Sequence, residues 1–322
     1  MYVVTGGAGF VGSNIICALN DRGLSDVIVV DRLNSENSKN LRGLRFAEYL
    51  DRDELRAAIA RGGLSAQIEA IIHQGACADT TGADADFMMD NNFTFSKELL
   101  AFAISRKIPF VYASSAAVYG TSVAFAEKAE NEHPLNLYGQ SKLAFDNHVR
   151  GLIDRVESTL VGLRYFNVFG PRESHKGKMA SMPYRIFRQI REQGRVRLFA
   201  GTDGFADGEQ RRDFIFVKDV VATNLEFAAR RSGKGIFNLG TGASRSFNDV
   251  ARAIIKLTGE GAIEYIPLPS SLAGKYQSFT EAALGALRKI GYELEFTRLE
   301  EGIAKSFPEW QRESLATESS PS

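Results

Sequence analysis

Tyr138 and Lys142 are the two side chains whose types and spacing best suit proton transfer in this sequence. They lie four residues apart, so an α-helix would place both on one face. A free tyrosine has a pKa of about 10 and is a poor base at neutral pH. A neighbouring ammonium group stabilises the phenolate, which lets the tyrosine act as a general acid or base. Ser115, at the end of a predicted strand, could hydrogen-bond a hydroxyl group that reacts there.

A glycine-rich stretch near the N-terminus has the form of a phosphate-binding loop. Residues 3–12 read Val-Val-Thr-Gly-Gly-Ala-Gly-Phe-Val-Gly, which fits both G-x-G-x-x-G and G-x-x-G-x-x-G. Glycines at these positions allow a tight turn and bring backbone N–H groups close to a pyrophosphate at a helix N-terminus. A strand-like run precedes the loop and an amphipathic helix follows it. We therefore expect a dinucleotide to contact Gly6, Gly9, Phe10, Val11 and Gly12.

The charged residues after the second predicted strand bear on which dinucleotide is bound. Asp31 ends that strand, at the distance from the glycines where a carboxylate meets the adenosine ribose. A carboxylate favours NAD, because it repels a 2′-phosphate. Arg32, Lys39 and Arg52 lie nearby, and such cations favour the 2′-phosphate of NADP. Any one of them could be an ordinary solvated charge. Three cations around one pocket nevertheless favour NADP, with NAD as the alternative.

Short apolar runs alternate with longer helical patterns along the first half of the chain. Strands that are apolar throughout are typical of parallel sheets buried on both faces. The predicted strands are 2–5, 27–31, 70–74, 109–114 and 159–164, and the helical patterns are 11–22, 51–61, 87–106 and 137–154. With right-handed crossovers this order predicts an α/β fold, a doubly wound parallel (Rossmann) sheet.

The pattern changes after about residue 170. We assign residues 1–169 to an NADP-binding Rossmann domain and 170–313 mainly to a smaller, interleaved substrate-binding lobe, some of whose elements return to the Rossmann sheet. Loops rich in Gly, Lys and Arg on a rigid scaffold usually recognise substrate, and here they are 173–181, 201–212 and 267–277. Residues 314–322 contain four serines and little apolar surface, so we expect a disordered tail.

Composition excludes several other classes of protein. The 322 residues contain 39 Lys and Arg against 39 Asp and Glu, so no basic excess is present for nucleic acid or an anionic membrane. No apolar run is long enough to span a membrane and the N-terminus lacks a signal-peptide pattern, which predicts a cytoplasmic protein. Cys17 and Cys77 make no disulfide framework, and no His or Cys has metal-ligand spacing, so we expect no metal site.

Together these motifs resemble the extended short-chain dehydrogenase/reductase family, whose members act on nucleotide sugars. The resemblance covers nearly the whole chain and includes residues 73–77 and 164–172. It implies that Ser115, Tyr138 and Lys142 are catalytic and that Lys142 also holds the nicotinamide ribose. It further implies cofactor contacts from Gln74, Gly75, Ala76, Cys77, Ala78 and Asn91, and substrate contacts from Asn167 and Val168.

Within this family, the residues after Ser115 bear on the reaction. Dehydratases of the family carry an acidic pair at this point to expel water, whereas Ala116 and Ala117 stand here. Oxidation through to an acid would need a nucleophilic cysteine, and none lies near Tyr138 in the sequence. Reversible oxidation is left, which means epimerisation or reduction of the sugar.

Further segments are similar to one branch of the family, the epimerases that invert C6″ of an ADP-activated heptose. These segments are 88–92, 96–100, 170–181, 264–267 and 274–280. The resemblance implies that Lys176 is a second catalytic acid or base. It implies that ADP-heptose is bound by Asn167, Val168, Lys178, Arg185, Phe199, Ala200, Gly201, Thr202, Arg212 and Tyr276. Lys178 replaces a residue that is often smaller and polar in this branch, and 207–210 is a small insertion. A homo-oligomer, in this branch a pentamer, and a role in lipopolysaccharide core assembly are also implied.

Two other functions are compatible with parts of this pattern. A UDP-hexose 4-epimerase or nucleotide-sugar reductase would share Ser115, Tyr138 and Lys142. A non-catalytic, NADP-sensing regulator could be built on the same scaffold. Such a regulator has no need of the Tyr138 and Lys142 pair, so the presence of the pair favours an enzyme.

Overall fold

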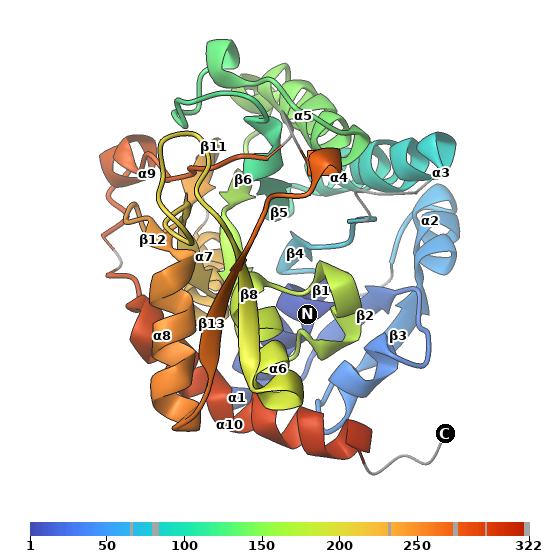
Figure 1. Cartoon of the computed structure of the whole chain (residues 1–322). Coiled ribbons are helices and arrows are strands. Elements are labelled where there is room, and N and C mark those ends of the chain that lie inside the picture. The colour runs from blue at the N-terminus through green and yellow to red at the C-terminus, as the bar shows by residue number, and fades with distance from the viewer. Residues whose placement is uncertain (65–66, 79–83, 231–232, 273–275, 294, 319–322) are drawn as a thin grey trace. The chain divides into compact units, whose positions relative to one another are not determined.

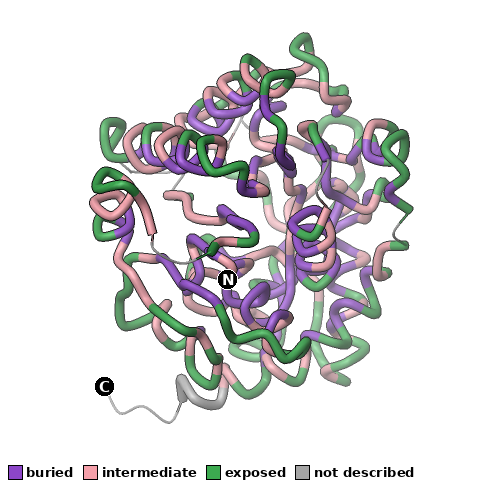
Figure 2. Tube along the Cα trace, turned by 180° about the vertical axis from the view of Figure 1, so that it is seen from behind, coloured by how far each residue is buried: buried purple, intermediate pink, exposed green. Residues whose placement is uncertain are grey.

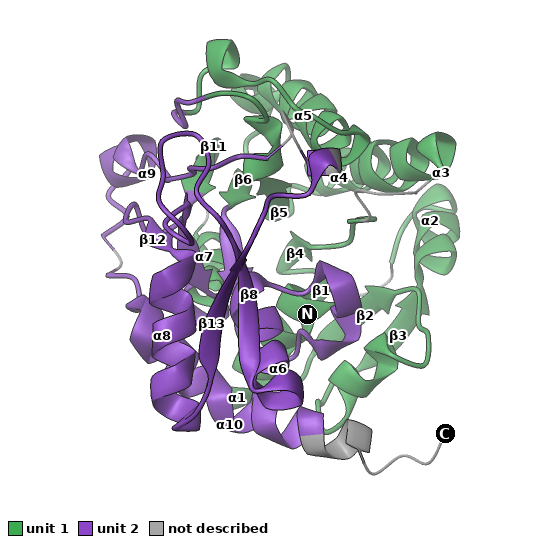
Figure 3. Ribbon diagram, viewed as in Figure 1, with its two compact units in different colours: residues 1–122, 127–165, 220–238 green, residues 123–126, 166–219, 239–322 purple. Residues whose placement is uncertain are grey.

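The computed structural model describes residues 1–64, 67–78, 84–230, 233–272, 276–293 and 295–318 (Figure 1). The chain divides into two compact units, coloured separately in Figure 3. Unit 1 contains Met1–Ser122, Glu127–Tyr165 and Val220–Asn238, and unit 2 contains Val123–Ala126, Phe166–Asp219 and Leu239–Ser322. The chain therefore passes between the units more than once, and a segment of its second half belongs to unit 1.

In the described residues, unit 1 is built on a seven-stranded sheet with the order β11-β6-β5-β4-β1-β2-β3. All the pairings from β3 to β6 are parallel. The predicted α/β fold with a doubly wound parallel sheet is confirmed. The strands are β1 (Tyr2–Thr5), β2 (Val27–Asp31), β3 (Glu48–Asp51), β4 (Ala70–His73), β5 (Phe110–Ser115), β6 (Leu160–Tyr165) and β11 (Lys234–Leu239).

The two edge strands of this sheet are the ones that the sequence pattern did not predict. The five predicted strands correspond to β1, β2, β4, β5 and β6, each within one residue of its expected bounds. β3 and β11 pair on one side only and carry exposed residues, for example Glu48 and Lys234. Their sequences therefore lack the unbroken apolar run by which the inner strands are recognised.

From β1, the strands β2 and β3 are added on one side of the sheet and the later strands, from β4 on, on the other side. The order of the strands therefore reverses between β1 and β4. A crevice at the carboxyl ends of the strands is the usual ligand site at such a switch point. Helix α1 (Phe10–Asp21) starts directly after the glycine-rich loop that follows β1. Helix α2 (Arg52–Ala60) starts after β3, where Asp51 and Glu54 form a capping box. The remaining helices of unit 1 are α3 (Ala85–Met89), α4 (Phe95–Ser105), α5 (Leu137–Arg150) and most of α7 (Val217–Ala229).

A π-helical turn interrupts the helix that the sequence predicts over residues 87–106. The turn covers Asp90–Thr94 and separates α3 from α4. A π turn holds one extra residue, and it re-aims the side chains that follow it. The polar side chain of Asn92, in this turn, is 1% exposed. The helical pattern predicted over 87–106 is confirmed, since α3, the π turn and α4 follow one another without a gap from Ala85 to Ser105. Hydrophobic periodicity does not register the single extra residue of the π turn.

Consecutive residues of the inner strands of unit 1 are buried, so both faces of its sheet are covered, and buried residues are purple in Figure 2. One face carries a large apolar cluster. Val3, Ile71 and Phe110 on neighbouring strands pack against Leu99 of α4 and Phe145 of α5, all at most 3% exposed. Burial of each large apolar side chain contributes about 1.5–3 kcal/mol. This core fixes the strand ends and helix starts that carry the candidate site.

Unit 2 combines short strand pairs with three longer helices. β8 (Arg195–Phe199) pairs in parallel with β13 (Ala262–Ile266), and β7 (Asn167–Phe169) with β10 (Phe214–Phe216). β9 (Arg211–Arg212) and β12 (Arg245–Ser246) are antiparallel. The helices are α6 (Met182–Gln193), α8 (Phe247–Thr258) and α10 (Leu299–Glu318), with the shorter α9 (Gly285–Lys289) between them.

The C-terminal helix extends further than the sequence predicts. Trp310 of α10 is fully buried and its Nε1 donates to the Gly170 carbonyl at 3.0 Å. Helix α10 runs on to Glu318, so the stretch 314–318 is helical rather than disordered. The sequence has no glycine or proline between 309 and 320 to end the helix, which explains the difference. Residues 319–322 lie outside the described part of the chain.

Two features are absent from the residues that the structure describes. None of their helices is both long enough and apolar enough to cross a membrane. No group of three or more His, Cys, Asp or Glu side chains among them is arranged to hold a metal ion.

Candidate active site and cofactor pocket

The glycine-rich loop between β1 and α1 is a tight turn of unit 1. Gly6 has a φ of +63°, which side-chain-bearing residues rarely adopt. A Cβ on Gly12 would lie 2.1 Å from the Gly6 carbonyl oxygen, so the close approach of α1 to the loop requires glycine there. Gly9 N–H donates to the same carbonyl at 3.0 Å. This turn presents the backbone N–H groups at the start of α1, which can bind a pyrophosphate.

A cavity of about 210 Å³ opens beside this loop, at the carboxyl ends of the strands. Residues predicted to bind the cofactor make up most of its lining: Gly6, Asp31, Arg32, Arg52, Gly75, Ala76, Cys77 and Asn91. Sequence reasoning missed the other lining residues, Thr5, Val30, Phe87 and Phe95, because these strand and helix positions look like ordinary core. The remaining predicted contacts are not in this lining: Gly9, Phe10, Val11, Gly12, Lys39, Gln74, Ala78 and Lys142.

Asp31 is tied to the backbone of the glycine-rich loop. Its Oδ2 accepts from Ala8 N–H at 2.8 Å and its Oδ1 from Arg32 N–H at 2.7 Å. Burial raises the pKa of Asp31, and these backbone hydrogen bonds lower it. An ionised carboxylate has about four lone-pair sites. Capacity is therefore left for the hydroxyl groups of a ribose.

The three cations considered for a 2′-phosphate differ in their surroundings. Arg52 lines the cavity with a side chain 11% exposed, and its guanidinium donates to Asn91 Oδ1 at 3.0 Å. Arg32 also lines the cavity, and its guanidinium lies 5.9 Å from the centre of the Phe87 ring. Lys39 pairs with Glu36 at 3.0 Å, in a short 3₁₀ turn (Asn37–Leu41) away from the lining. The geometry therefore favours the two arginines as phosphate ligands over Lys39.

A buried chain of hydrogen bonds supports the loop after β4. Thr5 Oγ1 accepts from Gly75 N–H at 3.1 Å and lies 2.6 Å from His73 Nδ1. His73 Nε2 lies 2.8 Å from Ser96 Oγ, which donates to the Asn92 carbonyl. Since Ser96 has already used its proton, His73 carries its own on Nε2 and accepts from Thr5 at Nδ1. Burial lowers the pKa of His73 to about 3, so this imidazole is neutral.

Asn92 connects the cofactor loop to the helix that bears Tyr138. Its Oδ1 accepts from Cys77 N–H at 2.7 Å and its Nδ2 donates to the Cys77 carbonyl at 3.0 Å. The same Nδ2 lies 3.0 Å from Ser141 Oγ, and Ser141 in turn donates to the Tyr138 carbonyl. Sequence reasoning passed over Asn92 in favour of its neighbour Asn91. The only signal was a polar pair inside an otherwise helical stretch.

Ser115, Tyr138 and Lys142 come together at the end of β5 and the start of α5. Asn136 caps α5 by accepting from Gly139 N–H at 2.9 Å, which sets Tyr138 in the first helical turn. Tyr138 and Ser115 are hydrogen-bonded through their side chains. Lys142 Nζ lies 5.9 Å from the centre of the Tyr138 ring and donates to the Ala113 carbonyl at 2.9 Å. The spacing in the sequence thus produces a catalytic type of cluster.

The sequence predicts that Lys142 stabilises the phenolate of Tyr138, and the pKa values of this cluster differ from that expectation. Burial raises the pKa of Tyr138 above its ordinary value, and the hydrogen bond with Ser115 lowers it. The expected lowering of the Tyr138 pKa by Lys142 is not among its causes, and the Lys142 ammonium donates to the Ala113 carbonyl instead. Burial also lowers the pKa of Lys142 to about 8, while Asp146 raises it. In the protein alone Tyr138 is therefore a protonated phenol at neutral pH, suited to donate a proton.

Asp146, one turn after Lys142, fastens α5 to the sheet. It is fully buried and accepts from Tyr112 OH, Ser114 Oγ and Arg164 Nε, each at 2.9 Å. Arg164, also fully buried, is the counterion. Because β5 carries both Tyr112 and Ser114, this carboxylate holds α5 against the strand that ends at Ser115.

Unit 2 contains its own cavity of about 490 Å³. Several residues expected to bind substrate line it: Asn167, Arg185, Phe199, Arg212 and Tyr276. The other lining residues are Met182, Gln189, Arg197, Leu198, Phe247, Ile266 and Leu272, which no motif singled out. Val168, Lys178, Ala200, Gly201 and Thr202 are not part of this lining.

The Arg212 guanidinium lies between two aromatic rings in this cavity. Its central carbon is 5.2 Å from the centre of the Tyr276 ring and 5.5 Å from that of Phe247. Phe199 meets the Tyr276 ring edge-on at 5.6 Å. Flat aromatic faces beside a fixed cation suit a planar base with an attached phosphate.

The insertion at 207–210 braces the segment from Phe199 to Thr202. Asp207 Oδ1 accepts from Gly201 N–H at 2.7 Å, and Gln210 Nε2 donates to the Ala200 carbonyl at 2.8 Å. Both interactions tie the backbone of this segment down. The insertion therefore supports one side of the cavity rather than entering it.

Lys176 lies in a compact loop of unit 2, in a 3₁₀ segment (Ser174–Met179). Buried Glu173 closes the base of this loop by accepting from Gly170 N–H at 3.0 Å and from Ser181 Oγ at 2.9 Å. Burial lowers the pKa of Lys176, while the Glu173 carboxylate raises it. Lys178, two residues on, is exposed. Of the two lysines, Lys176 is the more buried.

Residues 2–240, well over half of the chain, match the model of the NAD dependent epimerase/dehydratase family. The chain belongs to that family.

Curated relatives in the epimerase/dehydratase family are similar over almost the full length of this chain. The ADP-L-glycero-D-manno-heptose-6-epimerase of Alkalilimnicola ehrlichii is 51% identical, over 94% of this chain and 95% of the relative. The enzyme of the same name from Thiobacillus denitrificans is 47% identical, over 94% of this chain and 96% of the relative.

Solved structures of family members have the same fold. The ADP-L-glycero-D-manno-heptose-6-epimerase of Helicobacter pylori is 32% identical, with a TM-score of 0.83 and coverage of 96% of each chain. The UDP-glucose 4-epimerase of Thermus thermophilus, solved in complex with NAD, is 25% identical, with a TM-score of 0.76 and coverage of 96% of this chain and 98% of that one.

For a member of the epimerase/dehydratase family, the residues after Ser115 are informative. Ala116 and Ala117 begin a 3₁₀ turn, and Ser115 Oγ accepts from Ala117 N–H at 3.1 Å. Neither alanine can donate or accept a proton. The cluster can therefore move a proton at one oxygen through Tyr138, but these two positions supply no acid or base for the loss of water.

Proposed function

We propose that this protein is an ADP-glyceromanno-heptose 6-epimerase, which interconverts ADP-D-glycero- and ADP-L-glycero-D-manno-heptose using bound NADP. The observation that carries the proposal is the grouping of Ser115 and Lys142 around Tyr138, in the same unit as the cofactor cavity. The 51% and 47% identical relatives bear this enzyme's name.

The residues of unit 1 fit a dinucleotide. The loop in which a Cβ at Gly12 would clash is a cradle for a pyrophosphate, and Asp31 retains acceptors for a ribose. We assign adenosine and ribose contacts to the cavity lining, and the nicotinamide ribose to Lys142. A nicotinamide bound there would supply reversible hydride transfer, by which a carbinol carbon can be oxidised and then reduced with the opposite configuration.

Tyr138 takes the proton of the C6″ hydroxyl group in the oxidative direction and returns one in the reductive direction. Ser115 hydrogen-bonds the same oxygen and holds it at the tyrosine. The burial that raises the pKa of Tyr138 suits proton donation, and positive charge from Lys142 and the oxidised nicotinamide favours the phenolate. The two directions of the reaction therefore use the two protonation states of one phenol.

Lys176 supplies the second acid or base in this proposal. Inversion requires the exocyclic end of the 6″-keto sugar to turn, so its oxygen is then presented in a new direction. A pKa lowered by burial suits Lys176 to proton exchange near neutral pH. Arg212, Phe199 and Tyr276, with Asn167 and Arg185, are assigned to the ADP moiety.

The preference for NADP rests on Arg32 and Arg52, both of which line the cavity. Guanidinium groups bind phosphate through paired, charge-assisted hydrogen bonds. A homo-oligomer, a pentamer by family resemblance, and a cytoplasmic role in supplying heptose for the lipopolysaccharide core are part of the same proposal. Sedimentation of the purified protein tests the oligomeric state.

The decisive experiment incubates the purified protein with ADP-D-glycero-heptose and resolves the C6″ epimers by chromatography. We expect conversion to an equilibrium mixture without added cofactor, because the cofactor is regenerated in each cycle. Parallel assays use UDP-glucose and UDP-galactose. Faster turnover of the UDP-sugars would assign the protein to the 4-epimerases instead.

A further inference from the structure

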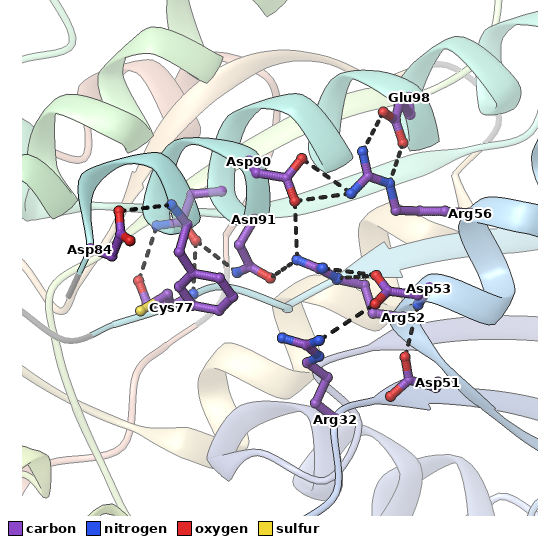
Figure 4. A network of polar contacts seen from close by, with 12 residues as sticks. Arg32, Asp51, Arg52, Asp53, Arg56, Cys77, Asp84, Asp90, Asn91 and Glu98 are labelled. Carbon is purple, nitrogen blue, oxygen red and sulfur yellow. Dashed lines mark hydrogen bonds and ion pairs between the residues drawn. The ribbon is translucent and has the colours of Figure 1, made fainter.

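A row of alternating charges runs from the cofactor cavity along α2 to α4 in unit 1 (Figure 4). Arg52 and Arg56 each lie between two carboxylates, and Arg32, at the cavity end, pairs with one. The row consists of Arg32, Asp53, Arg52, Asp90, Arg56 and Glu98. Arg32 and Arg52, the two members of the row that line the cavity, are the arginines assigned to the 2′-phosphate.

Asp53 is the residue that joins these two arginines. Its Oδ1 lies 2.8 Å from an Arg52 nitrogen and accepts from Arg52 Nε at 2.9 Å, while its Oδ2 lies 3.4 Å from Arg32. Arg52 lowers the pKa of Asp53, so the carboxylate is ionised at neutral pH. The Asp53 side chain is 55% exposed. It is held by the arginines and not by packing.

The other contacts of the two arginines do not use the same edge. Arg52 is fixed from its other side by Asn91, and Asp90 lies 3.4 Å away. Arg32 lies over the Phe87 ring and is itself 52% exposed. Asp53 therefore takes the guanidinium donors that both arginines would otherwise present together.

A 2′-phosphate needs the donors that Asp53 holds. It carries nearly two negative charges at neutral pH, so it binds guanidinium groups strongly and is repelled by a carboxylate beside them. The 2′-hydroxyl of NAD is neutral and needs only a hydrogen-bond partner such as Asp31. The charge on Asp53 therefore acts on NADP and hardly at all on NAD.

We propose that Asp53 is a specificity-determining residue, which weakens the binding of NADP relative to NAD by competing with the 2′-phosphate for Arg32 and Arg52. This inference rests on the proposed function, because it assumes that the cavity binds a nicotinamide dinucleotide. On this proposal, the preference for NADP depends on two opposing effects. Arg32 and Arg52 attract the 2′-phosphate, and Asp53 competes with it for both.

The test titrates cofactor-free protein with NADPH and with NADH, followed by nicotinamide fluorescence. In Asp53→Asn we expect NADPH to bind about tenfold more tightly, and NADH to change by less than about twofold. Asp53→Glu keeps the charge and should keep the wild-type ratio of the two dissociation constants. Asp53→Ser repeats the loss of charge with a smaller side chain.

The matched control is Asp21→Asn, which removes the same charge at the far end of α1, roughly 16 Å along the helix from Phe10. It should leave the ratio unchanged. An unchanged preference for NADPH in both Asp53→Asn and Asp53→Ser would overturn the proposal, since the charge of Asp53 would then have no effect on the choice of nucleotide. A lowered preference in both would overturn it as well, since Asp53 would then orient the arginines for phosphate. If wild-type protein binds neither nucleotide, the proposed function itself fails. The two failures are therefore distinct.

Discussion

The side chain of Asn92 binds both backbone groups of Cys77, accepting from its N–H at 2.7 Å and donating to its carbonyl at 3.0 Å. The side-chain amide of Asn92 thus pairs with the loop after β4 in the way that the backbone of a neighbouring strand would. The same amide reaches Ser141 on α5. One buried side chain thus sets the wall of the cofactor cavity and the helix that carries Tyr138 relative to each other, both within unit 1.

Replacement of Asn92 should therefore impair cofactor binding before it impairs the fold. We expect Asn92→Ala to weaken nucleotide binding about tenfold and to destabilise the protein by about 1–3 kcal/mol, because the partly buried backbone groups of Cys77 lose their partners. Thr94→Ala, an exposed position in the same π-helical turn, is the control and should change neither. Fluorescence titration and thermal denaturation provide the two measurements. A tenfold loss in the control as well would show that the turn, not the Asn92 amide, matters.

Tyr138→Phe should keep the fold and the bound cofactor but lower epimerisation at least about a hundredfold, the usual scale for a lost general acid or base. The change removes only the hydroxyl group that is hydrogen-bonded to Ser115. Turnover is measured with ADP-heptose and cofactor content by absorbance of the released nucleotide. Near-normal turnover would remove Tyr138 from the mechanism.

Lys176→Met should block net inversion while Tyr138 still supports one partial oxidation and reduction. A substrate whose C6″ is an aldehyde can accept and donate hydride without inversion, and it reports that partial step. Lys176→Arg keeps the positive charge but exchanges protons poorly, so it should fail in the same way. Inversion at the wild-type rate in Lys176→Met would contradict the two-base mechanism and leave Lys176 a loop cation.

Arg32→Ala should weaken NADP more than NAD, because one charge-assisted contact to the 2′-phosphate is lost. We expect a loss of about tenfold for NADP and little change for NAD, measured by titration of the cofactor-free protein. Equal weakening of both nucleotides would show that Arg32 does not read the phosphate.

Stability should fall in acid partly because of His73. Its pKa is lowered by burial to about 3 in the folded protein, against about 6.5 in the unfolded chain. Between these values the unfolded state binds more protons, so the free energy of unfolding decreases as the pH falls from about 6.5 towards 3. His73 contributes up to about 1.4 kcal/mol per pH unit in this window.

Comparison of His73→Gln with wild-type protein measures that contribution. Urea denaturation at several pH values should give a flatter dependence for His73→Gln, even if the variant is less stable throughout. His133→Gln, at an exposed histidine, should keep the wild-type slope. Parallel slopes for wild-type protein and His73→Gln would mean that His73 is not the group that titrates.

The sequence by itself determined the features that depend on short stretches of chain. The glycine loop follows from the spacing of Gly6, Gly9 and Gly12, because the close contact of Gly12 with Gly6 is made within one turn. Tyr138 and Lys142 share a helix face because helical spacing is local. The inner strands are recognisable because both of their faces are buried, which makes their sequences apolar throughout.

The tertiary structure alone decided what depends on partners distant in the sequence. Asn92 meets Cys77, and Asp53 meets Arg32, across 15 and 21 positions of the chain. No local pattern encodes these pairs, since many carboxylates and amides have the right chemistry and only the fold selects among them. Phe247, likewise, enters the unit 2 cavity from a helix start that looks like ordinary core. The raised pKa of Tyr138 belongs to the same class, because burial is a property of the whole packed unit and outweighs the neighbouring residues that the sequence displays.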